Sequence, residues 1–156
     1  GRKDIRVLTP DPKALAANDE GGTLWFRDAD ACCRIRKVEP LKRGLKPFAA
    51  WINGRKRFQS ATRQSIPLVE AGGARLKLNP LADWGPDEIE AYFVRHDLPR
   101  HPLVAKGYAS IGCEPCTHPV AEGEDARAGR WQGQDKTECG IHVSTISPLF
   151  RRPAGD

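Results

Sequence analysis

Five cysteines carry the most distinctive spacing in this chain. Cys32 and Cys33 are adjacent, Cys113 and Cys116 form a Cys-x-x-Cys pair, and Cys139 stands alone. Thiolates at such spacings can hold zinc or an iron–sulfur cluster, and a Cys-x-x-Cys pair can also act as a redox dithiol. An odd cysteine count with two adjacent thiols fits a disulfide-stapled secreted domain poorly, and it indicates a reducing, cytoplasmic setting.

The adjacent pair discriminates among these alternatives. Structural zinc sites usually separate paired thiolates by two to four residues. Neighbouring residues on a helix point about 100° apart, so both reach a single small tetrahedral ion with difficulty. A [4Fe–4S] cluster presents separate iron atoms to two divergent neighbours. The spacing therefore favours a [4Fe–4S] cluster on Cys32, Cys33, Cys113 and Cys116, while a zinc site and unliganded buried cysteines remain alternatives.

Basic residues follow the adjacent cysteines. Arg34, Arg36 and Lys37 lie within about one helical turn of the pair. Cations near a cluster would offset the negative charge of a thiolate-ligated cubane and shift its electronic properties. A solvated basic face is the alternative interpretation of these residues.

Cys139 has a different context, in the stretch Lys-Thr-Glu-Cys-Gly-Ile-His. Lys136 and His142 flank it, and Arg127 and Arg130 lie upstream; nearby cations lower the pKa of a nucleophilic thiol. This pattern favours covalent catalysis followed by hand-over to a second protein. An incidental cysteine is the alternative, because a lone cysteine is by itself only a moderate signal.

Length and composition define the protein class. The 156 residues suit one domain over 1–156, with 39% hydrophobic and 29% charged residues, as in globular proteins. The chain contains no apolar run of about 18 residues and no signal-like start. The net charge of +5 suits a small anion, nucleic acid or an ordinary solvated surface. The lack of methionine suggests a fragment of a longer protein.

Periodicity and turn residues predict short alternating elements. Strands are expected at 4–8, 48–52 and 74–80, a short polar helix or loop at 55–64, and helices at 13–18, 28–37 and 86–96. Pro40 should interrupt the second helix, with another turn at 41–45. The apolar stripe of the last helix should pack in the core; it comprises Ile89, Tyr92, Phe93 and His96. The alternation indicates an α/β fold with a partial sheet, followed by a loop-rich region from Leu98 onward.

Five motifs then resemble one known family. The stretches ACCRIRKVEPLKR, NPLADW, GYASIGCEPCTHPV, EDARAGRW and KTECGIH occur in the order found in assimilatory adenylyl-sulfate reductases. These enzymes are the cluster-containing branch of the phosphoadenylyl-sulfate reductase family. The resemblance runs from about residue 5 to residue 142. Adjacent cysteines, a distant Cys-x-x-Cys and a terminal ECG[I/L]H form a highly specific combination.

The resemblance implies an adenine-nucleotide α-hydrolase-like α/β fold and a thioredoxin-type oxidoreductase of cysteine biosynthesis. The four paired cysteines would hold the [4Fe–4S] cluster. Cys139, on a flexible catalytic tail at about 121–156, would attack adenylyl sulfate and become an S-sulfocysteine. Thioredoxin or a glutaredoxin-like dithiol would then release sulfite. Neither a membrane nor a nucleic-acid partner is implied, and a homo-oligomer remains open.

The resemblance also implies a substrate site. Lys37 would lie between cluster and substrate, and Arg63, Arg127 and Arg130 would contact the phosphosulfate, with His142 in the terminal motif. The family's N-terminal phosphate-binding loop is not in this sequence, and His118 stands where arginine is common. Trp131-Gln132-Gly133 replaces a longer aromatic run.

Two alternatives remain. Phosphoadenylyl sulfate, alone or with adenylyl sulfate, could be the substrate. In a different class, a zinc-stabilised basic module could bind nucleic acid through its four scattered tryptophans.

Overall fold

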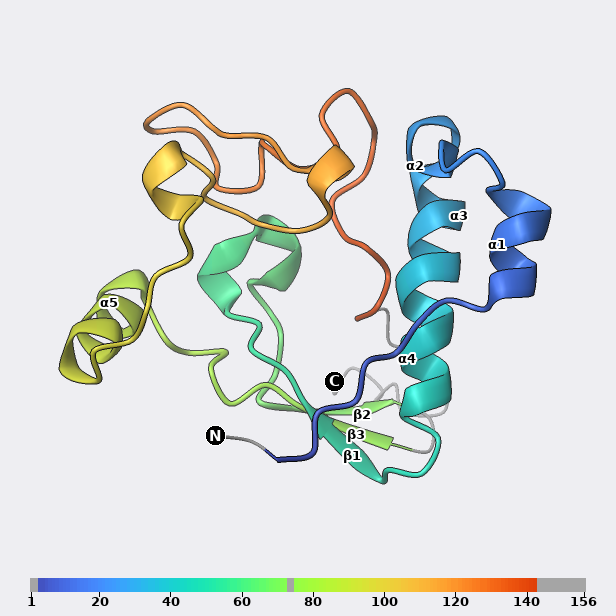
Figure 1. Ribbon diagram of the computed structural model, residues 1–156. Helices are drawn as coiled ribbons and strands as arrows, with labels where there is room; N and C mark the ends of the chain where they lie inside the picture. Colours follow the sequence, from blue (N-terminus) through green and yellow to red (C-terminus); the bar gives the residue numbers. More distant parts are fainter. Residues whose placement is uncertain (1–2, 73–74, 143–156) are drawn as a thin grey trace, which may run out of the picture. The chain divides into compact units, whose positions relative to one another are not determined.

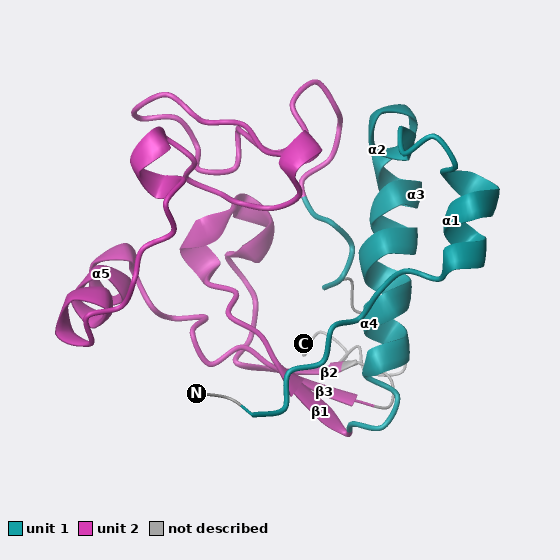
Figure 2. Cartoon of the chain, in the orientation of Figure 1, with its two compact units in different colours: residues 1–48, 138–143 teal, residues 49–137, 144–156 magenta. Residues whose placement is uncertain are grey.

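The computed structural model describes residues 3–72 and 75–142, whose contacts divide into two compact units. The first unit runs to Phe48 and takes in the segment that begins at Glu138; the second runs from Ala49 to Thr137 (Figure 2). The prediction of a single domain is not tested by this division and stays a prediction. Residues 143–156 of the predicted catalytic tail lie outside the described residues.

The regular elements in the described part of the first unit are all helical. Its elements are α1 (Pro12–Asn18), α2 (Leu24–Arg27), α3 (Ala29–Cys33), a π-turn (Arg34–Val38) and α4 (Glu39–Gly44). Asp11 caps α1 by accepting a hydrogen bond from the Lys13 N–H at 2.8 Å, and Pro12 follows at a first-turn position that needs no donor. The predicted helices at 13–18 and 28–37 are confirmed.

The predicted interruption at Pro40 is wrong, because the helix passes through it as one continuous coil (Figure 1). A proline inside an α-helix lacks one N–H donor and its ring clashes with the carbonyl four residues earlier. Here the π-turn stands immediately before α4, and the Glu39 N–H bonds to the Arg34 carbonyl five residues back. The wider turn accommodates Pro40 within the first residues of α4, so that the coil reaches Gly44.

The predicted strand at 4–8 is also wrong. These residues form no strand, and Ile5 and Val7 are 77% and 84% exposed. A strand requires a neighbouring strand to satisfy its backbone groups. The described part of the first unit contains none, so the apolar alternation of this stretch has no sheet to join.

The second unit contains a mixed three-stranded sheet of β1 (Ala50–Ile52), β2 (Val69–Gly72) and β3 (Arg75–Leu78) in the order β1-β3-β2 (Figure 1). β1 runs parallel to β3, whereas β2 runs antiparallel to it. The strands predicted at 48–52 and 74–80 are confirmed with shorter bounds, and β2 is an addition. Sheet and helices together confirm the α/β class.

The two faces of this sheet reverse the expected burial. Trp51, Lys77 and Glu70 lie opposite one another on one face, where the Lys77 side chain is only 7% exposed. On the other face Leu76 is 46% exposed and Ile52 is 69% exposed. The alternation of β3 correctly predicts a strand, but its buried face is the charged one.

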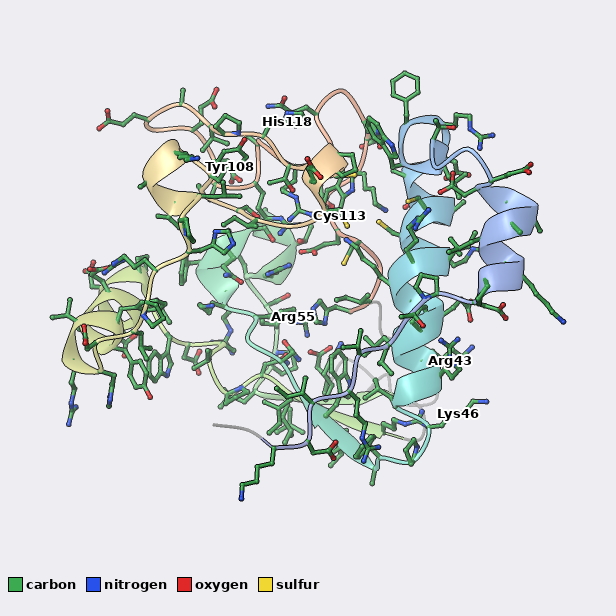
Figure 3. The ribbon with its side chains drawn as sticks, in the orientation of Figure 1. Arg43, Lys46, Arg55, Tyr108, Cys113 and His118 are labelled. Atoms are coloured by element: carbon green, nitrogen blue, oxygen red, sulfur yellow. The ribbon has the colours of Figure 1, made fainter. Side chains whose placement is uncertain are left out.

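A buried polar network explains the reversal. Glu70 accepts from the Lys77 ammonium at 2.9 Å and forms a second ion pair with Arg55, whose side chain is 9% exposed (Figure 3). Asn79, fully buried, donates to Glu70 Oε1 at 2.6 Å and accepts from Arg55 at 3.1 Å. The Asn53 side-chain amide donates to Asn79 Oδ1 at 2.8 Å. Each of these polar groups therefore has a hydrogen-bonding neighbour, which buried polar groups require.

The predicted helix at 86–96 is confirmed as α5 (Pro86–Arg95), but its predicted core packing is wrong. Within this described helix no residue is buried, and Tyr92 is 43% exposed. The aromatic residues instead form a surface cluster. The ring centroid of Tyr92 lies 5.3 Å from that of Trp84 and 4.2 Å from that of His96. Helical periodicity alone predicts the helix, but it does not predict whether another part of the protein buries its apolar face.

The remaining described residues of the second unit form ordered loops, as predicted. The polar stretch after β1 makes 3-10 turns at Arg57–Gln59 and Ala61–Arg63, and two others are Val104–Lys106 and Glu114–Cys116. One isolated β-bridge joins Thr117 to Arg130. Among the residues described, no helix has the length and apolar content needed to cross a membrane.

Replacing Glu70 by glutamine should lower the free energy of unfolding by about 3 kcal/mol, because it removes the carboxylate that lies between two buried cations. Chemical denaturation measures this cost. As a control, Glu90→Gln breaks an exposed pair with Arg100 and should cost less than about 1 kcal/mol. Equal costs for the two variants would show that the buried network does not stabilise the fold.

Candidate functional site

The adjacent cysteines end α3 in the first unit. Asp28 caps this helix by accepting from the Ala31 N–H at 2.9 Å. Cys32 and Cys33 are 9% and 5% exposed, and Cys32 packs with Leu24 and Ile35. The sequence correctly places this pair on a helix, where adjacent thiols diverge.

An ion pair places a cation beside Cys32. Arg36, on the π-turn, donates to Asp19 at 2.6 Å, and the other Asp19 oxygen accepts from the Leu24 N–H at 2.7 Å. The Arg36 bond, followed by the Leu24 bond, lowers the pKa of Asp19. The same carboxylate raises the pKa of Arg36, with a smaller contribution from the Cys32 thiol. Arg36 therefore lies within electrostatic reach of a candidate ligand.

The segment carrying Cys139 lies in the same unit and against the same π-turn. Gly140 adopts φ +84°, and a Cβ built on it would lie 3.5 Å from Val38 Cγ2. Cys139 and His142 are both half-buried, as is Lys37, the residue before Val38. The first unit thus brings the catalytic-motif segment to the turn that follows Cys32 and Cys33.

The Cys-x-x-Cys pair forms a tight turn in the second unit. Cys113 precedes and Cys116 closes a single 3-10 turn, with the Cys116 N–H bonded to the Cys113 carbonyl at 3.0 Å. The Thr117 hydroxyl donates to the same carbonyl at 2.7 Å. Cys113 is exposed (Figure 3), whereas Cys116 is buried.

This turn is hydrogen-bonded to the Arg-Ala-Gly-Arg-Trp segment. The Cys116 carbonyl accepts from Arg130 Nε at 3.2 Å and from the Trp131 N–H at 3.3 Å. Two residues after Cys116, the His118 N–H donates to the Gly129 carbonyl at 2.8 Å. A Cβ on Gly129 would lie 2.1 Å from the His118 carbonyl oxygen, so the close approach requires glycine there.

Three cations surround the Trp131 ring. The charged groups of Arg130, Lys136 and Arg127 lie 4.5, 5.4 and 5.7 Å from its centroid. Trp131 is 3% exposed. The sequence predicted Arg127 and Arg130 as contacts of an anionic substrate, which stays a prediction, and it treated Trp131 only as a departure from a family pattern. A tryptophan directly after one arginine and near two further cations is the signal that could have indicated its role.

Arg63 occupies a separate part of the second unit. It ends the 3-10 turn Ala61–Arg63 and donates to Gln59 at 2.8 Å. Burial, followed by the charge of Arg63, lowers the pKa of the neighbouring Lys56. Since Lys37 belongs to the other unit, the predicted convergence of Lys37, Arg63, Arg127 and Arg130 stays a prediction.

The convergence of the four cysteines is likewise untested. No disulfide joins any of the five cysteines, all of which lie in the described ranges. Within each unit, the described residues contain no group of three or more histidine, cysteine or acidic side chains placed to hold a metal. Of the four paired cysteines, Cys32 and Cys33 belong to the first unit and Cys113 and Cys116 to the second. Four thiols without a disulfide are a donor set that suits an iron–sulfur cluster.

Comparison with known proteins identifies the family. The phosphoadenosine phosphosulfate reductase domain matches residues 2–119. The chain belongs to this family. The predicted resemblance is thereby confirmed at the family level, and membership favours a reductase over the nucleic-acid-binding alternative.

Individual members of the family are highly similar to this chain. Adenosine 5'-phosphosulfate reductase of Mesorhizobium japonicum is 56% identical over 146 residues, which cover 94% of this chain and 58% of that protein. Phosphoadenosine 5'-phosphosulfate reductase of Gloeobacter violaceus is 52% identical, covering 79% and 53%. The chain therefore spans less than two thirds of these relatives.

A solved member of the family supports the fold. The phosphoadenylyl-sulfate reductase of Candida auris, determined as a phosphate complex, is 28% identical to this chain. Its TM-score is 0.53, with 67% of this chain and 51% of that chain covered.

The Asp19–Arg36 pair should make stability depend on pH. Because folding lowers the Asp19 pKa, its contribution is present above the ordinary value of 3.8 and is lost as pH falls through the folded pKa. Asp19→Asn should flatten the acid limb of the unfolding free energy, measured from neutral pH to about pH 3. The matched control is Glu20→Gln, an exposed neighbouring carboxylate that should leave the limb unchanged. An equally steep limb in Asp19→Asn would contradict the assignment.

Proposed function

We propose that this chain is part of an adenylyl-sulfate reductase that converts adenylyl sulfate to sulfite and AMP in cytoplasmic sulfate assimilation and cysteine biosynthesis. The observation that carries the proposal is the Cys116 carbonyl, which bonds both to Arg130 and to the Trp131 backbone. A candidate cluster ligand and a candidate anion-binding arginine thus belong to one hydrogen-bonded structure. The name of the Mesorhizobium japonicum relative supports the substrate.

Cys32, Cys33, Cys113 and Cys116 would hold a [4Fe–4S] cluster in an adenine-nucleotide α-hydrolase-like fold. When bound, the cluster would supply a charged centre that polarises its surroundings. Arg36 supports this assignment, since its guanidinium is held by Asp19 and interacts with the Cys32 thiol. Outer residues of this kind tune a metal centre through charge and hydrogen bonds.

The phosphosulfate would bind to Arg63, Arg127 and Arg130, with Lys37 and His142 completing the site. Arginine forks bind such oxygens with two parallel hydrogen bonds. The described contacts support the grouping of Arg127 with Arg130, because both guanidinium groups lie over the Trp131 ring. Cations here would also reduce the repulsion between an anionic substrate and an approaching thiolate.

Cys139 would be the nucleophile. Its thiolate sulfur attacks the sulfur of the sulfate group, a sulfur–sulfur bond forms, and the bond from that sulfur to the bridging oxygen breaks. The electron pair of the broken bond leaves with AMP, and the enzyme retains an S-sulfocysteine. Lys136 and His142 lie within three residues of Cys139 in sequence, one on each side of it.

A dithiol would complete the cycle. One thiolate of thioredoxin or a glutaredoxin-like protein attacks the Cys139 sulfur and expels sulfite, leaving a mixed disulfide. The second thiol of the partner then attacks the partner's sulfur in the mixed disulfide. This step frees the Cys139 thiolate and forms the partner's disulfide. The dithiol thereby loses the two electrons that reduce sulfate sulfur to sulfite sulfur.

Phosphoadenylyl sulfate is the second candidate substrate. The Gloeobacter violaceus relative and the Candida auris structure are both named for that nucleotide. The two substrates differ by a 3'-phosphate, so the ratio of kcat/KM values for the two nucleotides decides between them. The four paired cysteines favour adenylyl sulfate.

Mixing the full-length protein with adenylyl sulfate and no reductant should leave a sulfonate adduct on Cys139, detected by peptide mass spectrometry. Cys139→Ser should abolish this adduct and retain the broad visible absorption of the cluster, because the other four cysteines remain.

Two outcomes would overturn this assignment. One is an adduct on Cys113 or Cys116, and the other is full turnover by the serine variant. Either would return the Cys-x-x-Cys pair to the role of a redox dithiol.

Replacing Gly112 by alanine should weaken anion binding without unfolding the protein. A Cβ at Gly112 would lie 2.1 to 2.7 Å from guanidinium atoms of Arg130, and that flexible side chain would move. The loss should reach about 1.5–3 kcal/mol, the worth of a charge-assisted hydrogen bond. Calorimetric titration with the nucleotide measures it. Gly21→Ala, whose nearest atom lies 4.0 Å away, is the control; equal affinities in both variants would argue against Arg130.

A further inference from the structure

The backbone at Trp131 is held in an unusual conformation. Its φ is +49°, a region that bulky residues rarely adopt. The side chain is nonetheless 3% exposed, and the residue begins a turn in which its carbonyl accepts from the Gln134 N–H at 3.0 Å. Such a conformation persists only where the surroundings determine it, and such positions cluster at functional sites.

Two of the cations on this ring lie just before the Cys139 segment or contact the residue that precedes it. Lys136 lies 5.4 Å from the ring centroid, and its N–H bonds to the Gln134 carbonyl at 2.9 Å. Arg127, 5.7 Å from the centroid, donates to the carbonyl of Thr137. Thr137 is the last residue of the second unit before the chain continues to Cys139. The Trp131 ring therefore contacts both Arg127 and Lys136, the two residues that hold the end of the second unit at Thr137.

We infer that Trp131 is a positioning residue for Cys139. By binding Arg127 and Lys136 on its ring, it fixes the point at Thr137 from which the Cys139 segment leaves the second unit. The role assigned to Cys139 rests on the proposed function, but the anchoring itself does not. The inference concerns the indole ring, whose negative faces attract cations that otherwise repel one another.

Hydrogen bonding does not explain the choice of tryptophan. In the described structure the buried Trp131 Nε1 has no hydrogen-bond partner. Phenylalanine would therefore lose no hydrogen bond there, and it would keep an aromatic face of weaker attraction for cations. Asparagine tolerates positive φ but removes the ring. These two replacements separate the ring from the backbone conformation.

The test measures how fast iodoacetamide alkylates Cys139 in the full-length protein, with peptide mass spectrometry reporting each cysteine. Trp131→Asn should raise the Cys139 rate by about fivefold, as expected for the loss of a buried cation–π contact. Trp131→Phe should restore most of the protection. The matched control, Trp84→Leu, removes a tryptophan of the same unit that contacts Tyr92, and it should leave the rate unchanged.

A second pair of variants tests the cation. Lys136→Gln should raise the Cys139 alkylation rate by about twofold, whereas Lys106→Gln, an exposed lysine in a different turn, should not. Together the three variants and their two controls ask whether the anchor, rather than overall stability, protects the thiol.

Three results would overturn the inference. They are an unchanged Cys139 rate in Trp131→Asn, no restoration by Trp131→Phe, or an equal rise at Cys116 with a lower melting temperature, which would indicate general loosening. Alkylation needs no sulfonucleotide. Protection that depends on Trp131 without an adenylyl-sulfate adduct would therefore support the anchor and reject the proposed reaction.

Discussion

The carbonyl of Cys116 is the constraint on which the second unit's chemistry depends. It accepts from both Arg130 Nε and the Trp131 N–H, and the neighbouring Gly129 leaves no room for a side chain. The Cys-x-x-Cys turn and the Arg-Ala-Gly-Arg-Trp segment consequently cannot shift independently. A loop region with almost no regular structure gains its order from these few bonds, which explains how it can position reactive groups without a sheet or a long helix.

In the first unit a helix, rather than a loop, holds the paired cysteines Cys32 and Cys33. Its π-turn lets the coil continue through Pro40, and the extra residue in that turn sets the direction of the side chains that precede it. Arg36 is held by buried Asp19 and interacts with the Cys32 thiol, while Val38 meets Gly140 of the Cys139 segment. A π-turn costs hydrogen-bond geometry, so its position here, between the paired cysteines and the segment of the lone cysteine, is informative. One local irregularity therefore serves helix continuity and also contacts the Cys139 segment.

The sequence predicted the family and the helices better than the packing. Cysteine spacing and the motifs identified the family, and periodicity with turn residues identified α1 and α5, because these features are local. Burial is not local: Lys77 is buried by Glu70 seven residues earlier, and Leu76 beside it is exposed. Ile5 and Val7 alternate like a strand, but alternation does not supply a neighbouring strand. Pro40 failed as a helix breaker for the same reason, since its effect depends on the hydrogen-bond pattern of the preceding turn. Trp131 was missed because its partners come from both sides of it in the chain and meet only in the folded unit.

Positive charge is concentrated around Trp131 in the second unit. Arg127, Arg130 and Lys136 share one ring next to a candidate ligand turn, and a ring's quadrupole offsets only part of the repulsion among three cations. Such a cluster is more stable with an anion than without one, because an anion reduces the remaining repulsion. Arg127 connects this charge balance to the backbone at Thr137, since it also donates to the Thr137 carbonyl. A charge-assisted bond to a sulfate oxygen is about twice as strong as a neutral one, so a bound anion would compete for the guanidinium. An anion bound by Arg127 would thereby be coupled to the Thr137 backbone through one side chain, and coupling of this kind requires no contact between the anion and that backbone.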